Sequence, residues 1–412
     1  MIGRRLRRGY LEKENDSGIS HKMLKIAQNQ SGNVGSFKMA SMFFYGTLCD
    51  LELLEIVLDR PGSEITFFPA TLHDHAAYWA TTQNYPVIVP EAGTQTQGLY
   101  LPDLSEVDIT RLDFYESGFV YEPVPVDVET PMGTQRVLIY YCHDRSVVSD
   151  RRWELIDWQR DWGKTIRRAI RELMDQFGKV SAGEFDRWYP FCEDRAHSWS
   201  LAQNETRAPI EEGAGDQLVD VVEHQRIYTK FYALEEFKLS HRRFDGTMSP
   251  VLERALFVNR DAAMVLPYDP VSDRILLIEQ FRMGPFGRGD KNPWLYEPIA
   301  GMVDLGEAPI ETARREAQEE AGLEISRLIP MFDGYPSPGG STTYFHFFLG
   351  ECDLSNLDQG TGGLKDEGED IRVHIISFSD AFDMVMRGAC RVMPLITAIL
   401  WLAQYRNRDL VS

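Results

Sequence analysis

The sequence predicts an α+β protein of two domains, and three observations support this prediction. The chain has 412 residues, 43% of them hydrophobic, which suffices for two or three globular cores. Strand-like and helix-like patterns alternate in two separate blocks. A polar stretch at 202–217 lies between the blocks and has the composition of a linker. We therefore expect domains at 39–146 and 206–412, joined by a helical extension and linker over 147–205.

The beginning of the chain differs from the rest. Residues 1–38 are polar, poor in aromatic side chains and without clear periodicity, so we expect a flexible tail. Met39 opens the segment MASMFFYGTL, where structured sequence starts. Met39 is therefore a candidate translation start.

Composition narrows the classes of function. A net charge of −20 argues against a surface that coats nucleic acid, but not against a small anionic substrate. The five cysteines are scattered, without a C-x-x-C pair, as is typical of reduced thiols in a cytoplasmic protein. No apolar run is long enough to span a membrane. We expect a cytoplasmic protein with neither nucleic acid nor membrane as a partner.

The first block begins with an apolar strand that runs into a tight turn. Residues 42–48 read MFFYGTL, where Gly46 allows the turn and lets backbone N–H groups face an anion. Residues 98–130 read as strand, helix and strand, with Glu116 in the segment LDFYES. From 150 to about 201 the chain is helical, and an apolar stripe follows the helical spacing: Trp162, Ile166, Ala169, Ile170 and Leu173. We expect this stripe to pack against a domain rather than to bind a cofactor or nucleic acid.

The second block begins with strands and continues into a helix. Residues 228–282 contain apolar runs broken by DG and DP turns, which predicts a polar antiparallel arm and then a buried sheet. Residues 309–321 are good helix formers. Pro309 stands at the first turn and Gly322 just after the end, as expected for helix boundaries.

That helix lies in the most informative stretch of the chain, residues 301–323. The stretch fits G-x5-E-x7-R-E-U-x-E-E-x-G-U, with U aliphatic, at every fixed position: Gly301, Glu307, Arg315, Glu316, Ala317, Glu319, Glu320, Gly322 and Leu323. Residues four apart share a helix face, so Glu316 and Glu320 lie together with Glu319 beside them. Clustered carboxylates repel one another unless a cation is present, and hard oxygen ligands suit Mg²⁺ or Mn²⁺. The pattern predicts a divalent-metal site that would neutralise a diphosphate and orient a water molecule.

This pattern resembles the Nudix box of hydrolases that split a diphosphate linked to another group. The flanking segments LLIEQFR, PWLYEPIAGMVDLGE, YPSPGGST and GLKDEGEDIRVHIIS resemble bacterial ADP-ribose pyrophosphatases, as does Pro338, 15 residues after the box. The resemblance covers roughly 218–405. It implies a Nudix α/β/α sandwich with an N-terminal antiparallel arm. It also implies Mg²⁺-dependent hydrolysis of ADP-ribose to AMP and ribose 5-phosphate, with Mn²⁺ as the alternative metal.

The resemblance also implies roles for individual residues. The metal ligands would be the backbone carbonyl of Ala300 and three carboxylates, Glu316, Glu320 and Glu369. Glu367 would be the base that activates the attacking water, on a loop that can close over substrate, with Glu319 as the next candidate. Arg315 would pair with Glu319 and hold it in place. Four residues would contact substrate: Arg282 and Arg254, Phe231 by packing on adenine, and Glu297. The alternatives are a surface charge for Arg254 and a core aromatic for Phe231.

Members of this subfamily are domain-swapped dimers in which the N-terminal arm of one chain packs on the other. The matching arm here is roughly 225–246. The resemblance therefore implies a homodimer.

The first block resembles the gamma-glutamylcyclotransferase family, in its smaller AIG2-like branch. The resemblance covers about 41–145 and rests on YGTL at 45–48, GLYL at 98–101 and LDFYES. It implies a small mixed barrel with helices around a cavity. Glu116 would shuttle a proton from the substrate amine as it attacks the gamma-glutamyl carbonyl, giving 5-oxoproline. The backbone of the YGTL segment would hold the substrate carboxylate: Tyr45, Gly46, Thr47 and Leu48. A domain kept as a scaffold, without catalysis, is the alternative.

The order of the two blocks resembles that of bifunctional TrgB-like proteins linked to tellurite resistance, a phenotype that these residues do not explain. The leading interpretation is an ADP-ribose pyrophosphatase acting on a small nucleoside diphosphate. Two alternatives stay open. One is hydrolysis of another nucleoside diphosphate sugar, because the box does not choose between substrates. The other is a nucleotide-sensing regulator of the first domain.

Overall fold

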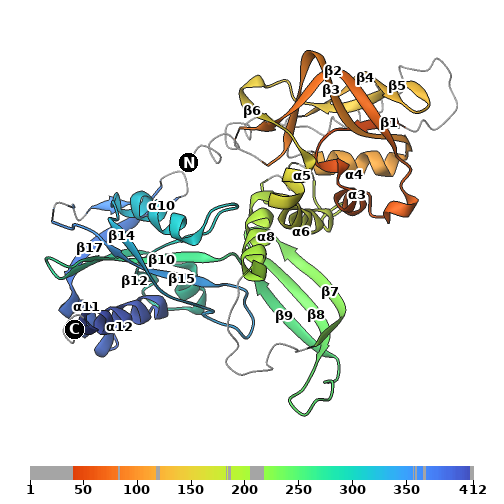
Figure 1. Ribbon diagram of the computed structural model, residues 1–412. Helices are drawn as coiled ribbons and strands as arrows, with labels where there is room; N and C mark the ends of the chain where they lie inside the picture. The colour runs from red at the N-terminus through yellow and green to blue at the C-terminus, as the bar shows by residue number, and fades with distance from the viewer. Residues whose placement is uncertain are drawn as a thin grey trace. The chain divides into compact units, whose positions relative to one another are not determined.

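The computed structural model describes residues 40–81, 84–116, 121–181, 183, 187–204, 218–355, 357, 360–364 and 368–408. The chain divides into two compact units, each described here by itself (Figure 1). Unit 1 comprises Met1–Ser200 with Thr229–Phe231, and unit 2 comprises Leu201–Tyr228 with Tyr232–Ser412. The predicted tail, most of the predicted linker and Glu367 lie outside the described residues. The predicted α+β class is confirmed, whereas the exact domain boundaries stay a prediction.

The sheet of unit 1 has the order β3-β1-β5-β4-β2-β6, and a further pairing of β2 with β3 closes five of its strands into a barrel. The strands are β1 Ala40–Phe44, β2 Phe68–Ala80, β3 Pro86–Leu104, β4 Glu122–Thr130, β5 Gly133–Tyr141 and β6 Val148–Arg152. Strand β1 pairs antiparallel with β3 and parallel with β5, so it lies inside the sheet with both edges satisfied. The predicted small mixed barrel is confirmed.

Helices accompany the barrel in unit 1. They are α3 Leu51–Leu58, α4 Glu106–Glu116, α5 Leu155–Trp158, α6 Lys164–Met174 and α8 Tyr189–Asn204, with a π-helical turn at Gln159–Gly163. The predicted apolar stripe falls on α6 and the turn before it. Ile166, Ala169, Ile170 and Leu173 are buried, and Trp162 is half-buried. The stripe is therefore part of a packed core, as expected from its spacing.

Unit 2 begins with an arm of three strands in the order β7-β8-β9: Val219–Thr229, Ala233–His241 and Leu252–Val258. Strands β8 and β9 are antiparallel, with Ala233 opposite Val258. The predicted arm is confirmed, but β7 begins six residues before the expected start at 225. Several large apolar side chains of β7 are exposed: Val219, Val221, Val222, Ile227 and Tyr228.

The main sheet of unit 2 has eight strands along the path β14-β15-β10-β11-β17-β16, with β12 beside β11 and β13 beside β10. Their bounds are β10 Ala262–Asp269, β11 Arg274–Phe281, β12 Trp294–Glu297, β13 Ile299–Met302, β14 Arg327–Gly334, β15 Phe345–Glu351, β16 Thr361–Gly362 and β17 Ile371–Ser377. The helices are α9 Met283–Arg288, α10 Pro309–Ala321, α11 Phe378–Met386 and α12 Met393–Arg408.

The sheet of unit 2 is covered on both faces. Alternate residues of β10 belong to different core clusters: Val265 packs with Ala313 and Ala317 of α10, and Leu266 packs with the cluster of α11 and α12. Figure 1 shows α10 on one side of the sheet and α11 and α12 on the other. The predicted α/β/α sandwich is confirmed. No helix among the described residues is long and apolar enough to cross a membrane.

Candidate active sites

The carboxylates of α10 lie against strand β13, as the sequence spacing requires. Helix α10 begins at Pro309 and ends before Gly322, which has the left-handed backbone (φ 62°) that glycine adopts without strain. The Glu320 residue is 2% exposed. A Cβ at Gly301 would lie 1.8 Å from Oε1 of Glu316. Glycine at the first position of the motif therefore leaves room for the Glu316 carboxylate.

Arg315 joins three carboxylates of the motif. Its Nε and Nη2 donate to the two Glu307 carboxylate oxygens at 3.0 and 2.9 Å. Its Nη1 donates to Oε1 of Glu316 at 2.5 Å and to Oε2 of Glu319 at 3.1 Å. The bidentate contact with Glu307 fixes the guanidinium plane, so Arg315 orients the carboxylates beside it. The predicted pairing of Arg315 with Glu319 is present.

The carboxylate cluster carries excess negative charge in a buried place. The pKa of Glu316 is raised to about 7: burial contributes most, Arg315 opposes it, and repulsion from Glu319 and Glu369 adds to it. Burial, then repulsion from Glu316 and Glu369, raises the pKa of Glu320 well above its ordinary value. Glu369, which precedes β17, thus acts on the pKa of both helix carboxylates. Its Oε2 accepts a hydrogen bond from Leu364 N at 3.0 Å.

A divalent cation fits this donor set. The ligand atoms would be carboxylate oxygens, and a cation would offset the burial and repulsion that raise the pKa of Glu316 and Glu320. Ala300 lies beside them on β13, where its N–H donates to Oε2 of Glu320 at 3.3 Å. Within the part of the chain that the structure describes, no three or more acidic, His or Cys side chains are arranged so that they could hold a metal ion. Arg315 instead holds Glu316 and Glu319.

Two of the four predicted substrate residues lie with this cluster. Arg282 Nε donates to Oε2 of Glu297 at 2.7 Å, and Arg282 also lowers the pKa of Glu320. Burial raises the pKa of Glu297, although Arg282 opposes this. Gln280, which the sequence did not single out, also contacts Glu297, at 3.4 Å from Nε2 to Oε2. Its position in LLIEQFR, two residues before Arg282 on the same side of a strand, is the signal that could have indicated it.

The other two predicted substrate residues belong to the arm, one on β9 and one in the turn between β7 and β8. Arg254 lies on β9, where its Nη1 donates to the backbone carbonyl of Glu253 at 2.8 Å. Phe231 groups with unit 1, and the centroids of its ring and the Phe191 ring are 4.9 Å apart. Their substrate roles stay predictions, as does the role of Glu367, which lies outside the described residues.

Unit 1 contains a cavity of about 40 Å³ at the end of α4. Glu116, the last residue of that helix, lines the cavity together with the predicted YGTL segment, Tyr45 to Leu48. Aromatic and apolar side chains form the rest of the wall: Phe43, Phe44, Tyr85, Pro86, Tyr115, Tyr121 and Tyr140. The structure therefore brings all the residues predicted for the first domain to one place.

Hydrogen bonds fix the YGTL segment in the cavity wall. The Tyr45 hydroxyl donates to the backbone carbonyl of Tyr140 at 2.9 Å, and Thr47 Oγ1 lies 3.0 Å from the Tyr115 hydroxyl. A Cβ at Gly46 would lie 2.5 Å from Cγ of Pro86. Glycine is required at this turn because the chain passes directly against Pro86.

The environment of Glu116 favours its neutral form. Burial, and then repulsion from Asp113, raises the pKa of Glu116 to about 8. A carboxyl group with a pKa in this range can both accept and return a proton near neutral pH. The Tyr140 hydroxyl donates to Oδ1 of Asp113 at 3.2 Å. Sequence reasoning named Tyr45 but missed the other tyrosines of the cavity wall: Tyr85, Tyr115, Tyr121 and Tyr140. Of these four, only Tyr115, inside LDFYES, carried a local signal.

Comparison with known proteins identifies both units. A NUDIX domain matches residues 258–391, and an AIG2-like gamma-glutamyl cyclotransferase domain matches residues 42–160. The ADP-ribose pyrophosphatase of Escherichia coli (strain K12) is 38% identical over 194 residues, which cover 47% of this chain and 91% of that protein. The ADP-ribose pyrophosphatase of Haemophilus influenzae is 35% identical over 188 residues, covering 45% of this chain and 86% of that protein.

The chain is also similar to a relative whose name gives GDP-mannose, and not ADP-ribose, as the substrate. The GDP-mannose pyrophosphatase of Pectobacterium atrosepticum is 32% identical over 192 residues, which cover 45% of this chain and 97% of that protein. Each of these three alignments covers most of the relative's own length. Three observations lead to the same family: the box on α10, the buried carboxylates and these sequence identities. The chain belongs to the Nudix hydrolase family, as an enzyme in which a Nudix pyrophosphatase domain follows an AIG2-like gamma-glutamyl cyclotransferase domain.

Proposed function

We propose that the Nudix domain hydrolyses ADP-ribose to AMP and ribose 5-phosphate with Mg²⁺. The observation that supports this proposal most directly is the buried cluster of Glu316, Glu320 and Glu369, whose mutual repulsion calls for a cation. The identity of 38% to an ADP-ribose pyrophosphatase favours ADP-ribose as the substrate. Nudix enzymes of this type generally use divalent ions, and Mg²⁺ is the choice that leaves sites for water and phosphate oxygens.

Each residue of the cluster has a proposed task. Glu316, Glu320, Glu369 and the Ala300 carbonyl hold the metal, which supplies charge neutralisation at the diphosphate when bound. Arg315 orients Glu316 and Glu319 through its contacts with both. Keeping the ligands fixed before substrate arrives lowers the cost of reaching the transition state.

Glu367 is the proposed base, which accepts a proton from the attacking water. Its position in the segment KDEGED, two residues before Glu369, places it next to a ligand residue along the chain. Glu319 is the second candidate, but its carboxylate already accepts a hydrogen bond from Arg315.

Four residues are proposed to bind substrate. Arg282 contacts diphosphate or ribose oxygens, since its Nη atoms offer the paired donors that such oxygens accept. Glu297 orients Arg282 through their 2.7 Å contact. Arg254 and Phe231 are assigned by resemblance alone, with Phe231 packing on adenine.

For the first domain we propose gamma-glutamylcyclotransferase chemistry in the 40 Å³ cavity. The substrate amine attacks the gamma-glutamyl carbonyl, its proton passes to Glu116, and Glu116 returns a proton to the leaving amine, giving 5-oxoproline. The raised pKa of Glu116, about 8, supports this task. The backbone of Tyr45, Gly46, Thr47 and Leu48 holds the substrate carboxylate. A scaffold without catalysis is the competing function.

We also propose a homodimer that forms through the Nudix arm. The exposed apolar side chains of β7 support this, because a second chain would remove them from water: Val219, Val221, Val222, Ile227 and Tyr228. Sedimentation equilibrium of the full-length chain tests the assembly, and a monomer at micromolar concentration contradicts it. A cytoplasmic location and a link to tellurite resistance stay predictions.

Two other functions remain for the Nudix domain. The 32% identity to a GDP-mannose pyrophosphatase favours another nucleoside diphosphate sugar as the substrate. A nucleotide sensor would bind such compounds without turnover. One assay distinguishes these three functions. The protein is incubated with Mg²⁺ and a panel of nucleoside diphosphate derivatives, and the phosphate that a coupled phosphatase releases from the products is measured. Turnover fastest with ADP-ribose supports the proposal, and binding without turnover supports the sensor.

Replacing Glu320 by glutamine tests the site in the same assay. Glu320→Gln keeps the side-chain size but removes a charged ligand, so we expect turnover to fall by about 10²–10⁴ while the fold survives. Glu324→Gln is the matched control, because Glu324 is an exposed residue just beyond the helix. Near-normal activity of Glu320→Gln at saturating Mg²⁺ would remove Glu320 from the metal site.

A further inference from the structure

A threonine inside helix α10 makes a contact that differs from the usual contact of a helical threonine. Thr312 is 0% exposed and occupies a position that the Nudix box does not fix. A threonine within a helix commonly hydrogen-bonds the carbonyl four residues back, as Thr110 and Thr397 do at 2.8 Å. Thr312 Oγ1 lies 3.5 Å from that carbonyl, of Ala308, but 2.7 Å from Oε2 of Glu307. Its hydroxyl therefore donates to the Glu307 carboxylate.

The carboxylate that receives this hydrogen bond also anchors Arg315. Oε2 of Glu307 accepts from Thr312 Oγ1 and from Arg315 Nη2, and its Oε1 accepts from Arg315 Nε. Thr312 and Arg315 are three residues apart on α10, so they lie on one face of the helix. The Thr312 hydroxyl thus fixes the rotation of the carboxylate that holds the guanidinium plane of Arg315.

The remaining donor of this guanidinium contacts a proposed metal ligand. Arg315 Nη1 donates to Oε1 of Glu316 at 2.5 Å. A guanidinium and a divalent cation both bind carboxylate oxygens, so Arg315 and a metal compete for Glu316. A guanidinium that Glu307 holds at two points cannot turn to follow the Glu316 carboxylate, whereas a loosely held one can. The contact with Glu307 therefore controls how readily Glu316 accepts a metal.

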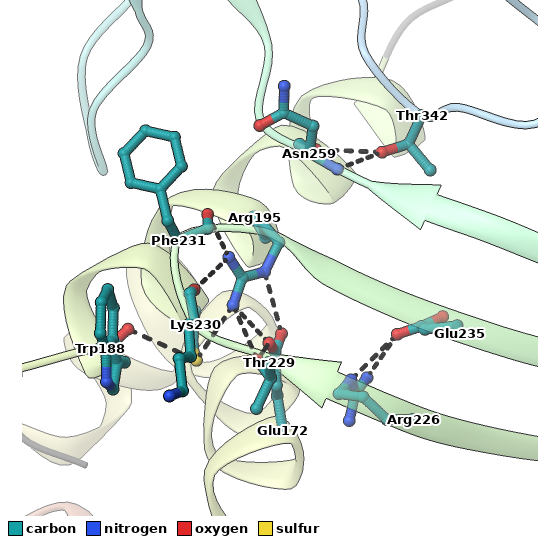
Figure 2. A network of polar contacts seen from close by, with 11 residues as sticks. Glu172, Trp188, Arg195, Arg226, Thr229, Lys230, Phe231, Glu235, Asn259 and Thr342 are labelled. Carbon is teal, nitrogen blue, oxygen red and sulfur yellow. Dashed lines mark hydrogen bonds and ion pairs between the residues drawn. The ribbon is translucent and has the colours of Figure 1, made fainter. Parts of the chain in front are cut away.

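A second arrangement of threonine, glutamate and arginine is present in unit 1, as Figure 2 shows. The Thr229 hydroxyl donates to Oε1 of Glu172, and the same oxygen accepts from Arg195 Nη2. Thr229 is 9% exposed, so its hydroxyl is also buried. The Nη1 atom of Arg195 donates to two backbone carbonyls, whereas that of Arg315 donates to carboxylates. Thr229 therefore offers a matched comparison for the loss of such a hydroxyl.

We propose that Thr312 is a positioning residue for the metal of the Nudix site. Its hydroxyl keeps Arg315 on Glu307, so that the Glu316 carboxylate is available to a divalent cation. Thr312 acts through Glu307 and Arg315 and does not contact the metal itself. This inference rests on the proposed function, through the role of Glu316 as a ligand.

Binding of Mn²⁺ to the full-length protein without nucleotide tests the inference, with the EPR signal of free Mn²⁺ as the measurement. Thr312→Val removes the hydroxyl but keeps the shape of the side chain, and Thr312→Ser keeps the hydroxyl. We expect Thr312→Val to raise the dissociation constant for Mn²⁺ about tenfold, the size of one net hydrogen bond, and Thr312→Ser to leave it within about twofold. An unchanged or lower dissociation constant in Thr312→Val overturns the positioning role.

Thr229→Val is the matched control, because it removes a buried hydroxyl from the arrangement in unit 1. We expect it to lower the melting temperature and to leave the affinity for Mn²⁺ unchanged. Melting curves of all variants show whether stability explains the result. An affinity that falls together with the melting temperature across the three variants means that packing sets it, which overturns the inference. If Thr312→Val does not fold, Thr312→Ala takes its place.

Turnover of ADP-ribose separates this inference from the proposed hydrolysis. The Mn²⁺ that the wild type binds and Glu320→Gln does not bind is the metal of this cluster. If the wild type hydrolyses ADP-ribose and Thr312→Val binds this metal normally, the inference fails and the proposed function stands. If the wild type binds this metal but hydrolyses no nucleotide, and Thr312→Val binds it about tenfold more weakly, the inference stands without the hydrolysis. Equal Mn²⁺ binding by the wild type and Glu320→Gln overturns both.

Discussion

Glu316 and Glu116 are both carboxyl groups whose pKa is raised by burial, but their neighbours differ. Glu316 lies beside Arg315 and further carboxylates, an arrangement that suits a bound cation. Glu116 lies among tyrosines, with Asp113 as the nearby charge that raises its pKa further. The first environment favours ionised ligands once a metal is present. The second favours a carboxyl group that exchanges protons.

The pKa of Glu116 predicts a pH-dependent stability. A carboxyl with a folded-state pKa of about 8 and an ordinary unfolded value binds more protons in the folded state between about pH 4.5 and 8. The free energy of unfolding therefore falls as pH rises through this window. Glu116→Gln removes the effect, so its melting temperature should exceed that of the wild type increasingly from pH 5 to pH 8. If the difference in melting temperature between the two proteins stays the same across this range, the charged form of Glu116 does not destabilise the folded protein.

Single residues of the α10 site were predictable because the helix converts sequence spacing directly into position. Glu316, Glu319 and Glu320 lie within one turn and a half, so no tertiary information was needed. The cavity around Glu116 is different. Tyr45, Tyr85 and Tyr140 come from separate strands or loops, and only the closed barrel brings them together.

At the scale of elements, the contact between β13 and α10 positions the Glu316 carboxylate. Gly301 faces the Glu316 carboxylate, with space for hydrogen but not for a methyl group. Gly362 of β16 has a similar role on the other side, because a Cβ there would lie 1.8 Å from the backbone oxygen of Glu320. Glycines thus let two strands approach the helix closely enough to surround its carboxylates.

Gly301→Ala should therefore move Glu316 or separate β13 from α10. We expect a loss of about 1–3 kcal/mol in the free energy of unfolding, as for other overpacked sites, and a larger proportional loss of pyrophosphatase turnover. Chemical denaturation and steady-state kinetics measure the two effects. Gly334→Ala on β14 is the control, since nothing lies within 4 Å of a Cβ there. Equal behaviour of the two variants would mean that the close approach is not needed.

The arm shows what element-scale reasoning lacked. The sequence predicted its place, but β7 already begins at Val219, directly after the expected linker. Exposed apolar residues such as Val221 and Val222 do not show the alternation that marks a half-buried strand. This part of β7 is a strand because it is hydrogen-bonded to β8, and the hydrophobic pattern of β7 itself does not indicate a strand there.

At the scale of the whole molecule, two active sites are proposed in one chain. They have no proposed residue in common, and they differ in their need for metal. The barrel site uses a mainly aromatic cavity with one proton-exchanging carboxyl in its wall, and the Nudix site uses clustered carboxylates. The two chemistries should therefore be separable by single substitutions in the intact protein.

Glu116→Gln and Glu320→Gln in the full-length chain make this test. Glutamine at 116 fills the same space but cannot accept the amine proton, so formation of 5-oxoproline from gamma-glutamyl amines or dipeptides should stop while ADP-ribose hydrolysis continues. Glutamine at 320 should have the opposite effect, and EDTA should abolish only the hydrolysis. Chromatography of amino-acid products over a broad set of gamma-glutamyl compounds measures the first activity. No turnover by a wild type that melts normally would favour the scaffold. Turnover that persists in Glu116→Gln would place the proton transfer on another group of the cavity, with the tyrosines that line it as the next residues to replace.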